Sequence, residues 1–227
     1  MLWSSTTLQA LWQLPRFALY CLHCQPQLKT LKLMRFSLDL NVRVWSAYAI
    51  CAINDSAPSE TLNLLGELLL SDCEEERTWN ESIGAITELG PRALPLLEQL
   101  ERAKNHRSSS VRWGLVEAFF EIEPETAIER VLPLVRDENG LVAETAIEAL
   151  SEHAAQDVQV INTYIWALGQ SDGSFDQPAR SAADALARIG SPAHAALPAL
   201  KRLASDPEIS ENFRESVNLA IAAISRN

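Results

Sequence analysis

Several motifs that mark common enzymes and membrane proteins are missing from this sequence of 227 residues. It contains no P-loop, no dinucleotide-binding fingerprint, no nucleophile elbow and no HExxH zinc motif, so nothing supports these phosphate, cofactor or hydrolase classes. It also has no run of about 18 apolar residues, which argues against a membrane-spanning helix. The four cysteines are scattered and indicate a reducing compartment. We therefore expect a cytoplasmic protein with no cofactor.

Positive charge is scarce as well. The chain has 19 Lys and Arg against 30 Asp and Glu, which gives a formal net charge of −11. Nucleic-acid binding depends on Lys and Arg that neutralise phosphates, so we expect no nucleic-acid partner. The charge is uneven, because residues 1–53 hold five basic residues and one acid. The acidic remainder favours steering of a basic partner, or serves solubility alone.

The residues that are present fit a helical hairpin between Pro178 and Pro207. Small and aliphatic residues recur at three-and-four spacing in its first half, which predicts a helix with a narrow apolar stripe. Gly190 then allows a left-handed stop, and Pro192 suits the first turn of a second helix, whose stripe resumes over residues 196–203. Such a hairpin cannot bury its apolar face alone, which predicts neighbours of the same kind.

The same pattern recurs along the chain. An anchor residue is followed by residues that are mostly small four and seven positions later, and by mostly aliphatic residues eight and eleven positions later. The anchors are Val42, Thr78, Val111, Val142, Pro178 and Phe213, at successive offsets of 36, 33, 31, 36 and 35 residues. The pattern also places His153 at a core position of repeat four. Repeats of this length predict an all-α fold, an α-solenoid or superhelix of about six helical hairpins.

The chain resembles HEAT repeats, and its repeats are most similar to the bacterial HEAT-like type also found in phycobilin lyases. The resemblance is carried by LGPRALPLL (89–97), IGSPAHAALPAL (189–200) and the helix openings Val42–Arg43 and Val111–Arg112. It covers roughly residues 26–227. The Arg expected after the anchor is Trp79 in repeat two and Ala143 in repeat four, and is displaced to Arg180 in repeat five. The resemblance implies a solenoid of paired helices and says little about function.

Two regions are predicted. An apolar and aromatic N-terminal capping region spans residues 1–25, and a HEAT-like repeat domain spans residues 26–227. The approximate repeats are 26–54, 59–90, 91–123, 124–154, 156–190 and 191–227. Between Leu168 and Ala179 the sequence QSDGSFDQP forms a longer loop, and such insertions lie on a surface edge of a solenoid and can join a binding site.

No catalytic or metal-binding residue is predicted. Cys21 and Cys24 flank His23 in a CLHC segment, but zinc sites usually need a second ligand pair, so we interpret the two cysteines as small apolar residues of the cap. HEAT-repeat hydroxylases that bind two irons use His–Glu dipeptides, and this sequence has none. HEAT-like DNA glycosylases need a cationic concave face, and the charge here has the opposite sign.

The candidate site is the outward surface of the second helix of each hairpin, which the resemblance implies to be the concave face. The predicted partner-binding residues are Glu81, Glu88, Trp113, Glu117, Phe120, Glu121, Glu144, Glu148, Glu152 and Asp184. Glutamate is also common on any solvated helix face, because it is a good helix former. The functional interpretation rests on Trp113 and Phe120, since aromatic anchors surrounded by charge are typical of protein-binding surfaces.

We therefore expect a non-enzymatic protein-binding module, monomeric in isolation, that engages a basic protein. An adaptor, an assembly factor and an immunity protein that blocks a basic toxin all fit this expectation. The alternative from a different class is a phycobilin-lyase-like enzyme or chromophore chaperone, which would need a pigment-sized pocket. A structural role within a larger assembly is a third alternative.

Overall fold

The computed structural model describes residues 25–54, 57–72, 75–153, 157–170 and 177–226. The capping region predicted at residues 1–25 lies outside these ranges except for its last residue. The CLHC segment and residues 171–176 of the longer loop are also outside them. The division into domains and repeats therefore stays a prediction.

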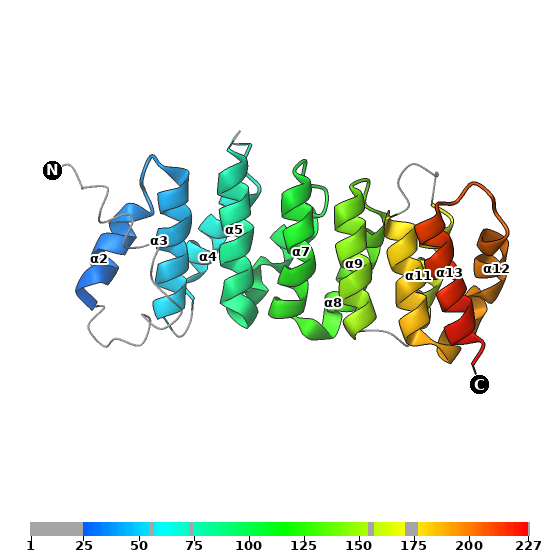
Figure 1. The fold of residues 1–227 in the computed structure, drawn as a ribbon. Coiled ribbons are helices and arrows are strands. Elements are labelled where there is room, and N and C mark those ends of the chain that lie inside the picture. Colours follow the sequence, from blue (N-terminus) through cyan, green and yellow to red (C-terminus); the bar gives the residue numbers. More distant parts are fainter. Residues whose placement is uncertain (1–24, 55–56, 73–74, 154–156, 171–176, 227) are drawn as a thin grey trace.

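The described chain alternates between two layers of helices (Figure 1). One layer, here called the long-helix layer, contains α3 (Leu40–Ile53), α5 (Glu76–Leu89), α7 (Ser109–Ile122), α9 (Gly140–His153), α11 (Gln177–Ile189) and α13 (Glu211–Ile224). The other contains α2 (Gln25–Met34), α4 (Ser59–Leu69), η2 (Gly90–Leu96) with α6 (Leu97–Ala103), α8 (Pro124–Val131) with η3 (Leu132–Arg136), α10 (Val158–Leu168), and η4 (Ser191–Ala196) with α12 (Leu197–Ala204). The helices of the long-helix layer stand in one row in chain order. The predicted all-α solenoid of about six hairpins is confirmed.

Short polar side chains fix where several long helices begin. The Asp39 carboxylate accepts hydrogen bonds from the backbone N–H groups of Asn41 (2.9 Å) and Val42 (3.2 Å) at the start of α3. The Asn139 side chain does the same for the N–H groups of Leu141 and Val142 at the start of α9. These bonds satisfy N–H groups that have no partner within the helix, so each helix starts at a defined residue.

Two glycines turn the chain from the long-helix layer into the next hairpin. Gly90 and Gly190 have φ values of 54° and 70°, a region that side chains other than glycine disfavour. A β-carbon on Gly90 would lie 3.5 Å from the carbonyl oxygen of Glu121, and one on Gly190 would lie 3.9 Å from that of Ala223. The two turns therefore pack in the same way against the end of the following long helix, and the stop predicted at Gly190 is confirmed.

The predicted apolar stripe is buried along α5 and α7, from Thr78 to Leu89 and from Val111 to Ile122. In α3 the stripe is different, because Val44, Ala47 and Cys51 are buried while the predicted Ala49 and Ile53 are half-buried. The core position predicted for His153 is wrong. His153 lies in the last turn of α9, and its side chain is exposed because it projects toward α7 instead of into the core.

In four of the six repeats the residue after the anchor has the same structural task. Arg43, Arg112 and Arg214 each donate a side-chain hydrogen bond to a backbone carbonyl in the segment before their own helix, at 3.1, 2.7 and 3.0 Å. Trp79 occupies the same position in α5, and its Nε1–H donates to the Ser71 carbonyl at 3.0 Å. Repeat two therefore has Trp79 where an arginine is expected, and this residue keeps the hydrogen-bond donor but not the positive charge.

Arg112 also pairs with a carboxylate, which neither Arg43 nor Arg214 does within the described residues. Its Nε and Nη2 donate to the two carboxylate oxygens of Asp137 at 2.7 and 2.8 Å, and both side chains are buried. The hydrogen bonds from this guanidinium to Asp137 raise the pKa of Arg112. Asp137 follows the last residue of η3 and lies in the short segment before α9, so this ion pair connects α7 to the segment that leads into α9.

Candidate functional site

The ten residues predicted to bind a partner lie on α5, α7, α9 and α11, and we call them together the acidic face. Glu81, Phe120 and Glu144 are half-buried, and the other seven are exposed. Trp113 has an exposed fraction of 46%, which is high for a large aromatic side chain. The outward orientation expected from the repeat pattern is present, while the role of these residues in binding stays a prediction.

Three carboxylates of the acidic face are used within the protein. Glu88 on α5 accepts a hydrogen bond from the Tyr48 hydroxyl of α3 at 2.9 Å. Glu81 forms an ion pair with Arg77, one turn earlier on α5, at 3.5 Å. Glu144 on α9 accepts hydrogen bonds from two residues of α11, and these are described next because they join neighbouring helices.

The Glu144 carboxylate connects α9 to α11. Its Oε1 atom accepts from Nε2 of Gln177 at 2.6 Å and from the hydroxyl of Ser181 at 3.3 Å. All three side chains are at least partly buried. A carboxylate held by two neutral donors from the next helix stabilises the packing of the two helices, so Glu144 is a structural residue first.

The remaining five carboxylates have no partner in the described part of the chain. They belong to Glu117, Glu121, Glu148, Glu152 and Asp184. No hydrogen bond or ion pair joins these carboxylates to any residue that the structure describes. Four of them lie on α7 and α9, so the unpaired negative charge of the acidic face is concentrated on these two helices.

A hollow of about 230 Å³ lies between α7 and α9. We call it the α7–α9 hollow, and it is lined by Trp113, Val116, Glu117, Phe120 and Glu121 of α7 and by Thr145, Ala149 and His153 of α9. The sequence prediction had included four of these residues, which recur on α7 at helical spacing. The structure therefore brings the two predicted aromatic residues together with two of the unpaired carboxylates.

Two contacts between the helices form the walls of the α7–α9 hollow. The Trp113 Nε1–H donates a hydrogen bond to the Thr145 hydroxyl at 3.0 Å. The Phe120 ring stacks on the His153 ring, with a centroid distance of 4.3 Å and an angle of 23° between the ring planes. Both contacts fix the orientation of an aromatic ring, so the hollow has a defined shape before any partner binds.

The partner-binding residues predicted from the sequence include none of the three α9 residues that line this hollow. Helical spacing had placed Thr145 among the outward positions of α9, but it was not chosen as a binding residue. His153 was assigned to the core, because the repeat pattern extends to the last turn of α9. The stacking of His153 on Phe120 joins residues 33 positions apart in the sequence, and no local pattern indicates which side chains meet between helices.

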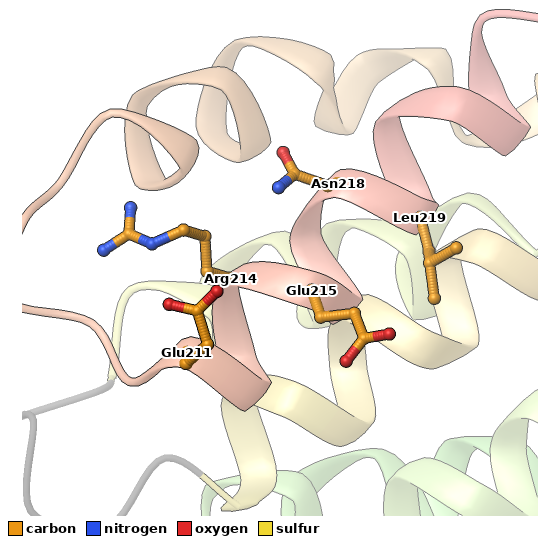
Figure 2. A pocket seen from close by; sticks show the side chains of 5 residues that line it. All are labelled: Glu211, Arg214, Glu215, Asn218 and Leu219. Atoms are coloured by element: carbon orange, nitrogen blue, oxygen red, sulfur yellow. The ribbon is translucent and has the colours of Figure 1, made fainter.

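A second hollow, of about 330 Å³, lies along α13 and is lined by Glu211, Arg214, Glu215, Asn218 and Leu219. Figure 2 shows these side chains spread along one helix. The Arg214 guanidinium donates to the carbonyl oxygens of Ala204 (3.0 Å) and Ile209 (3.3 Å), so its position serves the fold. The hollow has no aromatic wall, and we regard it as the weaker candidate.

The described residues offer no metal centre, since no group of three or more His, Cys, Asp and Glu side chains among them could hold an ion. Cys51 is buried, and this burial raises the pKa of its thiol to about 11 although Arg92 lowers it somewhat. The thiol is therefore protonated and unreactive at neutral pH. Within the same part of the chain, every helix is too short or too polar to cross a lipid bilayer.

Comparison with known proteins agrees with this architecture. Residues 178–206, which form most of the hairpin of α11 and α12, match the PBS lyase HEAT-like repeat. A search of curated proteins gave no matching sequence. The described helices therefore form a two-layered solenoid in which one hairpin is similar to a HEAT-like repeat.

Solved structures of repeat proteins share the fold at low sequence identity. A designed armadillo repeat protein in complex with peptide (KR)4 is 17% identical, with a TM-score of 0.52 over 88% of this chain and 100% of that chain. Two engineered proteins of the Northeast Structural Genomics Consortium are 19% and 17% identical, with TM-scores of 0.51 and 0.50. Each covers 87% of this chain, and the alignments span 98% and 96% of those proteins. At such identities the likeness shows the fold alone.

Proposed function

We propose that this HEAT-like repeat protein is a non-enzymatic binding module that engages a basic protein through the acidic face. A HEAT-like repeat scaffold supports a binding module built from repeats. The observation that carries the proposal is the α7–α9 hollow, where Trp113 and Phe120 lie among unpaired carboxylates. In this proposal the protein is a monomer in the cytoplasm and acts as an adaptor, an assembly factor or an immunity protein.

Charge is the physical reason for choosing a basic partner. The unpaired carboxylates of Glu117, Glu121, Glu148 and Glu152 can pair with Lys or Arg without breaking a bond inside the protein. A net charge of −11 also speeds the encounter with a basic partner through long-range attraction. The aromatic rings then supply apolar area at the centre of the contact, where binding energy is usually concentrated.

A phycobilin-lyase-like function has less support. Sites for small molecules and cofactors typically enclose about 300–1,000 Å³. The α7–α9 hollow, at about 230 Å³, is smaller than this range, and its lining includes Glu117 and Glu121, which suit a cation better than a bulky pigment. The hollow of about 330 Å³ along α13 reaches the range but has no aromatic wall. We therefore keep the protein-binding function as the proposal.

The test compares two variants with the same change in charge. The acidic-face variant carries Glu117→Lys, Glu121→Lys, Glu148→Lys and Glu152→Lys. The control variant carries Glu67→Lys, Glu98→Lys, Glu125→Lys and Glu129→Lys, which replace exposed glutamates of α4, α6 and α8 in the other layer. Circular dichroism first establishes that both variants keep the helix content of the wild type.

Affinity capture from the native host with the wild-type protein identifies the partner, whose purified form is then titrated against all three proteins. We expect a basic partner that binds the wild type and the control variant with affinities within about tenfold, while the acidic-face variant binds at least about a hundredfold more weakly. Binding to the wild type should weaken as salt is raised. Equal affinity of the partner for the two variants would show that the acidic face is not the binding surface.

A further inference from the structure

The size and the walls of the α7–α9 hollow indicate what part of a partner it takes. A hollow of about 230 Å³ is too small for a folded element or a cofactor and is large enough for one long side chain. Its lining combines three aromatic rings, from Trp113, Phe120 and His153, with the carboxylates of Glu117 and Glu121. Burying those carboxylates beneath an apolar or an acidic side chain would be unfavourable, because their charge would lose water without gaining a partner.

A cationic side chain satisfies both parts of this lining. Cations bind over aromatic faces within about 6 Å of the ring centre, and carboxylates pair with them directly. Between the two basic side chains, arginine fits better. Its planar guanidinium can stack on an aromatic ring and at the same time donate in a fork to a carboxylate, whereas the lysine ammonium is a strongly hydrated point charge.

The hollow is also formed before binding. The Trp113 indole is held by its hydrogen bond to Thr145, and Phe120 is held by its stacking on His153. Glu117 and Glu121 lie one turn apart on α7, so their carboxylates leave the same side of the helix. Because these aromatic side chains are already held in place, little of their conformational freedom is lost when a partner's side chain enters, which lowers the entropic cost of binding.

We infer that the α7–α9 hollow is a receptor for a single arginine side chain of the basic partner, an inference that rests on the proposed function. The guanidinium lies against the aromatic walls and pairs with Glu117 and Glu121. The hydrocarbon part of the arginine covers Val116 and Ala149. Arginine in this position provides specificity, while Glu148 and Glu152, which do not line the hollow, contribute through general attraction.

The test uses three short peptides that differ in one central residue. They have the sequence Gly-Ser-X-Ser-Gly with blocked ends, where X is arginine, lysine or norleucine. Nuclear magnetic resonance follows the indole N–H signal of Trp113, which is assigned by its disappearance in Trp113→Phe. We expect a saturable shift with the arginine peptide, binding weaker by roughly threefold or more with lysine, and no shift with norleucine. Equal binding of the arginine and norleucine peptides, or no shift with arginine, would overturn the inference.

A matched pair of variants separates the hollow from general attraction. Glu117→Gln with Glu121→Gln removes two charges that line the hollow, and Glu148→Gln with Glu152→Gln removes two charges of α9 outside it. We expect the first pair to weaken binding of the arginine peptide by about tenfold and the second by no more than about twofold. If both pairs weaken binding equally, the hollow has no special role and the inference is wrong.

The longer peptide (KR)4 distinguishes failure of this inference from failure of the proposed function. If (KR)4 binds the wild type and loses affinity with the acidic-face variant, but the arginine peptide does not shift Trp113, the inference is wrong and the proposed function stands. If (KR)4 binds the wild type and the acidic-face variant equally, the proposed function is wrong and the inference falls with it.

Discussion

Two adjacent boundaries of the long-helix layer use glutamate in opposite ways. Between α9 and α11, the Glu144 carboxylate accepts hydrogen bonds from Gln177 and Ser181 and joins the helices. Between α7 and α9, the carboxylates of Glu117 and Glu121 form no hydrogen bond or ion pair with a described residue, and both residues line the hollow. The same residue type on the same face is therefore structural at one boundary and available for binding at the next.

The buried side of each boundary explains the difference. Arg112 connects α7 to the segment before α9 through its paired hydrogen bonds to Asp137, so buried side chains stabilise this boundary. The residue equivalent to Arg112 in α9 is Ala143, which has no polar side chain, and there the half-buried Glu144 supplies the connection. A boundary that is stabilised by a buried pair leaves its surface residues free for another task.

The largest expected effect comes from breaking the buried pair. Arg112→Ala leaves Asp137 buried without its partner, and we expect the free energy of unfolding to fall by about 3–5 kcal/mol. Arg77→Ala, which removes the more exposed pair with Glu81, should change it by less than about 1 kcal/mol. Urea unfolding followed by circular dichroism measures both. Similar losses in the two variants would contradict the stabilising role assigned to the inner side of the α7–α9 boundary.

The turn at Gly90 gives the next largest effect, and it tests how α5 is placed against α7. Gly90→Ala forces an alanine into a backbone region near φ 54°, and we expect a loss of about 1–3 kcal/mol in unfolding free energy. Gly84 lies within α5 with open space around it, so Gly84→Ala should stabilise the protein by up to about 1 kcal/mol. Opposite signs in the same unfolding assay are the predicted result, and a loss for both variants would contradict it.

A smaller effect on stability is expected from the hydrogen bond that Trp79 of α5 donates to the segment before its helix. Trp79→Phe keeps a ring in the core but removes the hydrogen bond to the Ser71 carbonyl, which should cost about 1–2 kcal/mol in unfolding free energy. Trp166→Phe is the control, because no hydrogen bond from the Trp166 indole occurs within the described residues, and it should cost less than about 1 kcal/mol. Equal costs would mean that the hydrogen bond of Trp79 does not replace the family's arginine.

The smallest expected effect on stability comes from the hydrogen bond between Tyr48 and Glu88, a residue of the acidic face on α5. Tyr48→Phe removes the hydrogen bond to Glu88 at an exposed site, so unfolding free energy should fall by less than about 1 kcal/mol. The released Glu88 carboxylate should leave the affinity for (KR)4 equal to that of the wild type or slightly higher. A clear fall in peptide affinity, measured by calorimetry, would show that Tyr48 itself contributes to the site.

The sequence was sufficient for the architecture because each hairpin repeats the same local signals. The stripe of α5 and α7 and the turn at Gly190 follow from residue spacing and backbone preference, both of which are local. The stripe of α3 was misplaced, since apolar residues occur on several sides of that helix and spacing cannot choose among them. Val44 and Cys51 are buried there, in a helix that packs against α2, α4 and α5.

The candidate site was predicted as a face and not as a set of contacts. Helical spacing indicated that Trp113, Glu117 and Phe120 point outward, and the structure agrees. Spacing could not indicate that Glu144 is held by Gln177, 33 residues later, or that His153 stacks on Phe120. These contacts depend on the lateral and rotational placement of adjacent helices, which is set by core packing across the whole layer.

The most direct test of the central claim uses two alanine variants on one helix. Glu144→Ala and Glu148→Ala remove carboxylates one turn apart on α9, the first paired with α11 and the second unpaired. Calorimetry measures the affinity of each variant for (KR)4, and urea unfolding measures its stability. We expect Glu144→Ala to lower the unfolding free energy by about 1–2 kcal/mol and to leave the affinity within about twofold of the wild type. We expect Glu148→Ala to lower the affinity by roughly threefold with stability unchanged. The reverse pattern, or equal effects of both variants on affinity, would contradict the division between structural and binding carboxylates.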